Sequence, residues 1–131
     1  MSFVTPRSLG PLNNEVRAYY NSANPRAVIL MLAPDLIQKM GLDYHVRVHV
    51  GTGQNISQVR MLHRESNRDG CRKAITYQGR GKSGRVVFSA GQIGRRAPAK
   101  TIVVPHRFDG DDLIVDLSAL PKDREEVSRA A

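Results

Sequence analysis

The chain has 131 residues, of which 40% are hydrophobic and 24% charged, a balance that suits one domain with a small apolar core. Twenty Lys and Arg against twelve Asp and Glu give a net charge of +8, and no apolar run approaches the roughly 18 residues of a membrane-spanning helix. A single cysteine excludes a disulfide framework and a cysteine-based zinc site. Because no apolar export segment opens the chain, we expect a cytoplasmic protein with no membrane partner.

The first third of the chain predicts an arm, a buried strand and a helix. Residues 1–25 hold three prolines and no sustained periodicity, which indicates an extended arm with at most a short helical or strand segment at 15–20. The apolar run 26–32 is bounded by prolines, and its length favours a buried strand. A short helix is predicted over 35–40, because Pro34 fits the first helical turn and a glycine follows at its end.

Strict alternation over residues 44–50 is the clearest strand signal. It points three valines inward and turns His45, Arg47 and His49 outward. Turns containing glycine then separate further predicted strands at 56–64, 72–78, 85–89, 101–108 and 113–117. Asp69-Gly70 and Asp109-Gly110 are both typical of hairpins.

These turns predict a mainly β (β-rich α+β) fold, a small antiparallel sheet or open barrel of about six or seven short strands with one short helix. Pro105 cannot donate to a ladder, so its strand is expected at a sheet edge. The β-rich domain is expected to cover residues 26–120, between the arm and a charged tail at 121–131.

Positive charge is concentrated in the middle of the chain. Residues 1–59 carry a net charge of +2, residues 60–107 carry twelve basic and two acidic side chains, and residues 108–131 carry a net −4. Such a concentration attracts polyanions and speeds their encounter. A solvated basic surface that aids solubility is the alternative interpretation.

Glycines surround the basic residues near position 82. Gly81-Lys82-Ser83 is similar to the end of a phosphate-binding P-loop, but Thr76 stands where that motif needs glycine and a strand follows in place of a helix. We interpret the segment as a hairpin tip whose backbone and cations approach phosphate. The residues predicted to contact phosphate are Arg80, Lys82, Arg85, Arg95, Arg96 and Lys100, with Arg47, Arg60 and Arg64 on the sheet face.

The residue pattern predicts no enzyme, no metal and no cofactor. On a strand, His45 and His49 lie about 13 Å apart, too far to share one zinc ion. Cys71 has no activating neighbour in the sequence, and the aspartates near 109–112 suit a turn. Aromatic residues are scarce, which favours double-stranded DNA over RNA as the nucleic acid.

Part of the chain resembles a known family. Ala33-Pro34-Asp35-Leu36-Ile37-Gln38-Lys39-Met40-Gly41-Leu42, followed by the three alternating valines and a returning strand, is similar to the swapped-hairpin module of AbrB-type transition-state regulators. The resemblance implies an interleaved homodimer that binds DNA through basic residues. Asp43-Tyr44-His45 departs from the family's usual Gly-Asp, so no DNA contact is carried over. The overall layout is similar to small uncharacterised proteins of temperate phages.

The leading hypothesis is therefore a non-enzymatic, dimeric nucleic-acid-binding protein, favouring double-stranded DNA and acting as a transcriptional regulator. One alternative is a protein-interaction module, such as a phage-encoded inhibitor or adaptor, whose arginines dock an acidic protein surface. Another is a structural assembly component whose arm and tail tie neighbouring molecules together.

Overall fold

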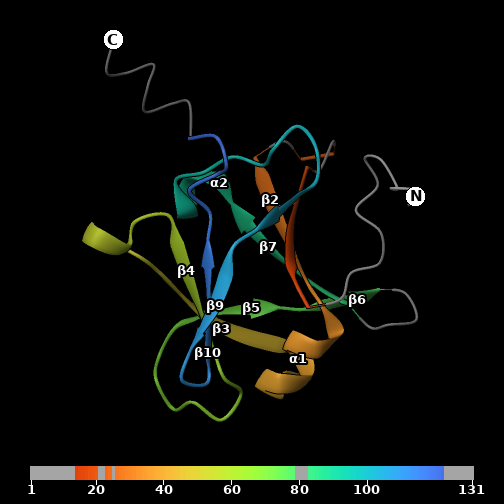
Figure 1. The fold of residues 1–131 in the computed structure, drawn as a ribbon, viewed down its shortest axis with the longest axis vertical. Helices are drawn as coiled ribbons and strands as arrows, with labels where there is room; N and C mark the ends of the chain where they lie inside the picture. Colours follow the sequence, from red (N-terminus) through yellow and green to blue (C-terminus); the bar gives the residue numbers. More distant parts are fainter. Residues whose placement is uncertain (1–13, 21–22, 25, 79–82, 123–131) are drawn as a thin grey trace, which may run out of the picture.

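Two five-stranded antiparallel sheets, sheet A and sheet B, make up the fold (Figure 1). The computed structural model describes residues 14–20, 23–24, 26–78 and 83–122. Sheet A has the order β6 (Thr76–Gln78), β7 (Ser83–Ser89), β2 (Ala27–Leu32), β1 (Val16–Tyr20) and β8 (Ile102–Val104). Sheet B has the order β5 (Cys71–Ala74), β3 (His45–Val50), β4 (Gln58–Leu62), β10 (Asp112–Asp116) and β9 (His106–Asp109). The predicted mainly β class is confirmed.

The described residues form ten strands, more than the six or seven predicted. One additional strand is β1. The sequence left open whether residues 15–20 form a short helix or a strand, and the structure shows a strand there, inside the segment predicted as an extended arm. It pairs with β2 and β8, and its Val16 and Ala18 are fully buried. The other two arise because two predicted strands, 72–78 and 101–108, are each divided by one residue.

These two dividing residues carry the chain from one sheet to the other. Ile75 separates β5 of sheet B from β6 of sheet A, and Pro105 separates β8 of sheet A from β9 of sheet B. Proline cannot donate a ladder hydrogen bond, and both strands that flank Pro105 lie at sheet edges, as predicted. Its carbonyl still accepts a hydrogen bond from the Asp116 N–H at 2.9 Å.

In the described part of the chain, two short helices accompany the sheets. Helix α1 (Pro34–Met40) confirms the predicted helix, with proline at its start and Gly41 in the left-handed region at φ 64°. Helix α2 (Ala90–Ile93) begins after Ser89, whose side chain accepts a hydrogen bond from the Gln92 N–H. A 3₁₀ turn, η1 (Gly53–Asn55), lies between β3 and β4. Over the described residues, no helix is long and apolar enough to cross a membrane.

One apolar core lies between the two sheets and includes residues from both helices. All six residues of β2 are buried, as expected for a continuous apolar run in a central strand. In β3 the predicted alternation holds, because Val46 and Val48 face the core while His45, Arg47 and His49 are exposed. The opposite, outward face of sheet B therefore presents polar side chains.

The connections between strands confirm two predicted hairpins and correct a third. β3 pairs with β4 and β9 pairs with β10, as the turns at 51–55 and 109–111 predict. The expected hairpin at Asp69-Gly70 is wrong, because β5 pairs with β3 and not with β4. A local turn signal carries no information on the partner of the next strand. The tip of the β6–β7 hairpin, with Arg80 and Lys82, lies outside the described residues.

Candidate nucleic-acid interface

The outward face of sheet B gathers basic side chains from four strands and from Arg64, just beyond β4. The strand register places Arg47 opposite Arg72, and His49 opposite Arg60. Farther across the sheet, Ile114 of β10 lies between Arg60 and Arg107. We call this surface the basic face and define it by Arg47, Arg60, Arg64, Arg72 and Arg107 with His45 and His49.

A loop crosses the basic face. β4 and β5 are both antiparallel to β3, so they run parallel to each other, and residues 63–70 must cross β3 to join them. His49 points outward and its Nε2 donates to the Asp69 carbonyl, which fixes the crossing on the outer side. Leu62, which alternation also turns outward, is only 1% exposed. We call residues 63–70 the crossing loop.

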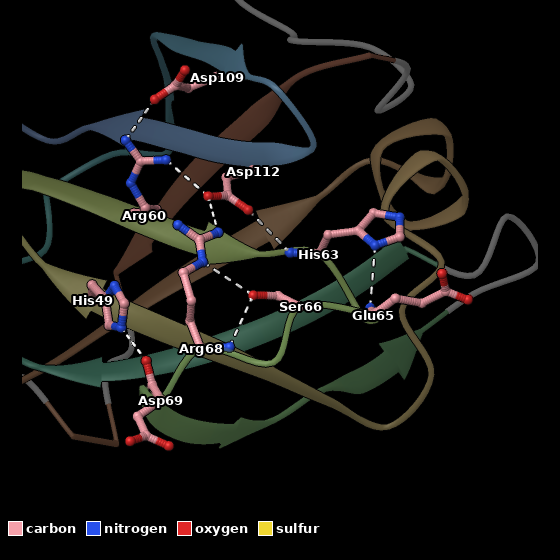
Figure 2. A network of polar contacts seen from close by, with 9 residues as sticks. All are labelled: His49, Arg60, His63, Glu65, Ser66, Arg68, Asp69, Asp109 and Asp112. Carbon is pink, nitrogen blue, oxygen red and sulfur yellow. Dashed lines mark hydrogen bonds and ion pairs between the residues drawn. The ribbon is translucent and has the colours of Figure 1, made fainter.

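An ion-pair network anchors the crossing loop to the sheet (Figure 2). Arg60 donates to Asp109 at 2.7 Å and to Asp112 at 2.8 Å. Arg68 of the loop donates to the same Asp112 oxygen, while the His63 N–H donates to its other oxygen at 3.4 Å. Two arginines and two aspartates leave the network without net charge.

The network changes the acidity of its members. Burial raises the pKa of Asp112, but the hydrogen bonds from Arg68 and Arg60 outweigh it, so this pKa lies below its ordinary value. Hydrogen bonds to Asp109 and Asp112 raise the pKa of Arg60. Asp112 and Arg60 therefore both stay charged at neutral pH, and Arg60 has a fixed orientation.

On one side of the network lies a hollow of about 370 Å³, which we call the Arg47 hollow. Arg47, Arg64 and Arg72 line it, and among the described residues none of these three forms an ion pair. Arg72 donates to His45 Nδ1 at 3.2 Å, which makes that nitrogen an acceptor. Guanidinium groups gathered without ion pairs repel one another, and a bound anion reduces this repulsion.

Asp43 is the acidic residue at the rim of the Arg47 hollow. Its carboxylate accepts hydrogen bonds from the backbone N–H groups of Tyr44, at 2.6 Å, and His45, at 3.4 Å. These bonds lower the pKa of Asp43, with a smaller contribution from the charge of Arg64. The carboxylate thus stabilises the backbone of residues 43–45. Because three arginines and one aspartate line the hollow, its net charge is positive.

A second hollow, of about 250 Å³, lies beside the β3–β4 turn. We call it the Asn55 hollow. The residues that line it include Thr52, Asn55, Gln58, Arg60, Arg107 and Ile114. Arg60 is held by the neutral network, so this hollow combines neutral hydrogen-bonding groups and an apolar residue with the charge of Arg107.

The nine arginines and lysines predicted to contact phosphate are not all brought together. Arg47, Arg60 and Arg64 lie on the basic face. Arg85 lies on the outward face of sheet A, opposite Met31 and Thr76. Arg96 and Lys100 lie in the segment after α2, outside the basic face, and Arg80 and Lys82 fall outside the described residues.

Arg95 requires a correction. Its Nε and Nη2 both donate to the Ser57 hydroxyl, at 2.9 and 2.7 Å, and its Nη1 donates to the Leu120 carbonyl at 2.9 Å. These donors are used inside the protein, which removes the basis of the predicted phosphate contact. Ser57 is buried and has a left-handed backbone at φ 73°, so Arg95 stabilises the end of the β3–β4 turn.

Two arginines of the basic face were not among the residues predicted from the sequence. In β9, Phe108 is partly buried against the core and the adjacent Arg107 is exposed, so the alternation of this strand could have identified Arg107 as an outward-facing residue. Arg72 joins Arg47 only through the pairing of β5 with β3, for which the sequence holds no local signal.

No group of three His, Cys, Asp or Glu side chains that could hold a metal ion occurs among the residues described. Comparison with protein-family models, curated proteins and solved structures returns no match to this chain. The resemblance to AbrB-type regulators therefore stays a prediction.

Proposed function

We propose that the protein is a non-enzymatic nucleic-acid-binding protein that holds a phosphate backbone on its basic face. The observation that carries the proposal is the grouping of Arg47, Arg64 and Arg72 around one hollow without ion pairs among the described residues. Guanidinium groups match the bidentate geometry of phosphate oxygens and keep their charge at every physiological pH. The scarcity of aromatic residues makes double-stranded DNA the first ligand to titrate.

The number of arginines sets the expected salt dependence. Arg107 and the three arginines of the Arg47 hollow can neutralise about four phosphates and release their counterions. On duplex DNA this predicts a slope of about −3.6 when the logarithm of the association constant is plotted against the logarithm of the salt concentration. Affinity should then fall about 150-fold between ~50 and ~200 mM salt.

The test is a fluorescence-anisotropy titration of a labelled duplex and of the matching single strand at several salt concentrations. Each of Arg47→Gln, Arg64→Gln and Arg72→Gln should reduce the slope by about one. Arg85→Gln, on the outward face of sheet A, is the matched control and should leave the slope unchanged. Absence of binding at low salt, or equal slopes in all four variants, contradicts the proposal.

A nuclease-treated pull-down examines the competing hypothesis of an acidic protein partner. Because arginines pair with carboxylates as well as phosphates, such a partner would use the same basic face. A protein that stays bound after nuclease treatment, and that the Arg47→Gln variant loses, favours the protein-interaction module over nucleic acid.

A further inference from the structure

The β3–β4 turn, residues 51–57, has a more constrained shape than a hairpin connection requires. A β-carbon on Gly51 would lie 1.9 Å from the Asn55 carbonyl oxygen, so the two backbone segments touch. The Asn55 N–H donates to the Thr52 carbonyl at 2.9 Å. Ser57 has a positive φ, which is uncommon for a residue other than glycine.

Arg95 holds this conformation from outside the turn. Two of its nitrogens donate to the buried Ser57 hydroxyl, and the Gly51 N–H donates to the Gln58 carbonyl at 2.8 Å. Strained backbone conformations persist when surrounding contacts fix them, and they are concentrated at binding sites. The residues of the turn that line the Asn55 hollow are therefore held in a fixed arrangement.

The lining of the Asn55 hollow suits a nucleobase better than a phosphate. Asn55 and Gln58 each carry a side-chain amide, which donates and accepts hydrogen bonds, and the lining also includes the largely buried apolar residue Ile114. A phosphate uses neither the acceptors nor the apolar surface. The hollow, at about 250 Å³, is smaller than the pockets of drug-sized ligands and has room for one ring system.

The two arginines of this hollow flank the apolar residue. Arg60 and Arg107 lie opposite Ile114 on its two neighbouring strands, so their backbones are about 9.6 Å apart across the sheet. Arg60 is held by Asp109 and Asp112. The plane of a guanidinium group can stack on a base. The major-groove edge of a purine can also be recognised by hydrogen bonds, from the amide of Asn or Gln to adenine and from the guanidinium of Arg to guanine.

We propose that the Asn55 hollow binds one unpaired purine base of a nucleic-acid strand whose phosphates contact the Arg47 hollow. This inference rests on the proposed function, since the backbone contacts bring the strand to the face. A base stacked in an intact duplex cannot enter a hollow, so the ligand is a single strand or a duplex with an extruded base.

The test compares strands of equal length and charge. A short labelled oligothymidine and the same strand with one central adenosine or guanosine are titrated at one salt concentration. The purine-containing strand should bind about fivefold more tightly or better, the effect of one good bidentate contact. Asn55→Ala and Gln58→Ala should abolish this preference, whereas Gln54→Ala, in the same turn but outside the hollow, should keep it.

The outcomes separate this inference from the function on which it rests. If every strand binds equally and with the full salt slope, the backbone-binding function stands and the base pocket is refuted. A preference that survives in the Asn55→Ala/Gln58→Ala double variant also refutes the pocket. If neither strand nor duplex binds at low salt, the proposed function fails and the pocket fails with it. Far-ultraviolet circular dichroism and thermal melting of each variant show that lost preference is not lost folding.

Discussion

Replacing Asp112 by asparagine removes the charge at the centre of the ion-pair network and keeps the shape of the side chain. Asp112 is 4% exposed and accepts hydrogen bonds from Arg60, Arg68 and the His63 N–H. The asparagine side chain has one carbonyl oxygen in place of the two carboxylate oxygens of Asp112. The variant therefore loses one charged hydrogen-bond acceptor at a position that water hardly reaches. Arg60 retains its contact with Asp109.

The expected loss follows from the exposure of each partner. A hydrogen bond between charged groups contributes about 1.5–3 kcal/mol when shielded, and the Arg60 side chain is 30% exposed. The Arg68 side chain is 48% exposed, so water replaces most of its lost interaction and it adds less than about 1 kcal/mol. Asp112→Asn should therefore lower the free energy of unfolding by about 2 kcal/mol and the Tm by roughly 8 °C. Asp111→Asn, an exposed neighbour, is the control and should change it by less than ~0.5 kcal/mol.

Urea denaturation of the wild type and both variants at several pH values measures this contribution. The folded-state pKa of Asp112 is lowered, so its stabilisation is fully present above the unfolded-state pKa of about 3.9 and is lost as pH falls through the folded value. The difference between wild type and Asp112→Asn should be full at neutral pH and should close in acid. A difference below ~0.5 kcal/mol at neutral pH, or one that acid leaves unchanged, refutes the reasoning.

Two further substitutions test the β3–β4 turn, in addition to the titrations of the arginine and amide variants. Gly51→Ala forces a β-carbon against the Asn55 carbonyl and should destabilise the fold by about 1–3 kcal/mol in thermal melting. The control is Gly91→Ala, where an added β-carbon has no atom within 4 Å; this variant should be neutral or more stable by about 0.5 kcal/mol. Arg95→Met leaves the buried Ser57 hydroxyl without its donors and should cost about 2 kcal/mol in urea denaturation; an unchanged midpoint contradicts the positioning role of Arg95.

The sequence predicts those parts of the fold that depend on neighbours in the chain. Alternation around Val46 and Val48 identifies the inward and outward sides of β3, and hence the exposure of Arg47. Pro34 and Gly41 mark the ends of α1 because their backbone preferences are local. The edge position of the strands beside Pro105 follows from its missing donor alone.

The candidate site depends on pairings between distant segments, which local patterns do not contain. Arg72 reaches Arg47 because the crossing loop carries β5 past β3, contrary to the hairpin that Asp69-Gly70 indicates. Arg95 lies in the basic part of the sequence and was therefore predicted to contact phosphate. In the structure its guanidinium donates hydrogen bonds to the buried hydroxyl of Ser57, 38 positions away in the chain. Net charge thus locates the basic part of the chain, and tertiary structure decides which cations are free.

The four edge strands also limit how copies of this chain can associate. The strands β5, β6, β8 and β9 have only three or four residues each, and one end of each adjoins the bend between the two sheets. Such short, interrupted borders offer a poor template for a foreign strand, and this is one way in which β proteins avoid uncontrolled aggregation. Association of this folded form through side chains on the broad sides of its sheets would leave its backbone ladders intact.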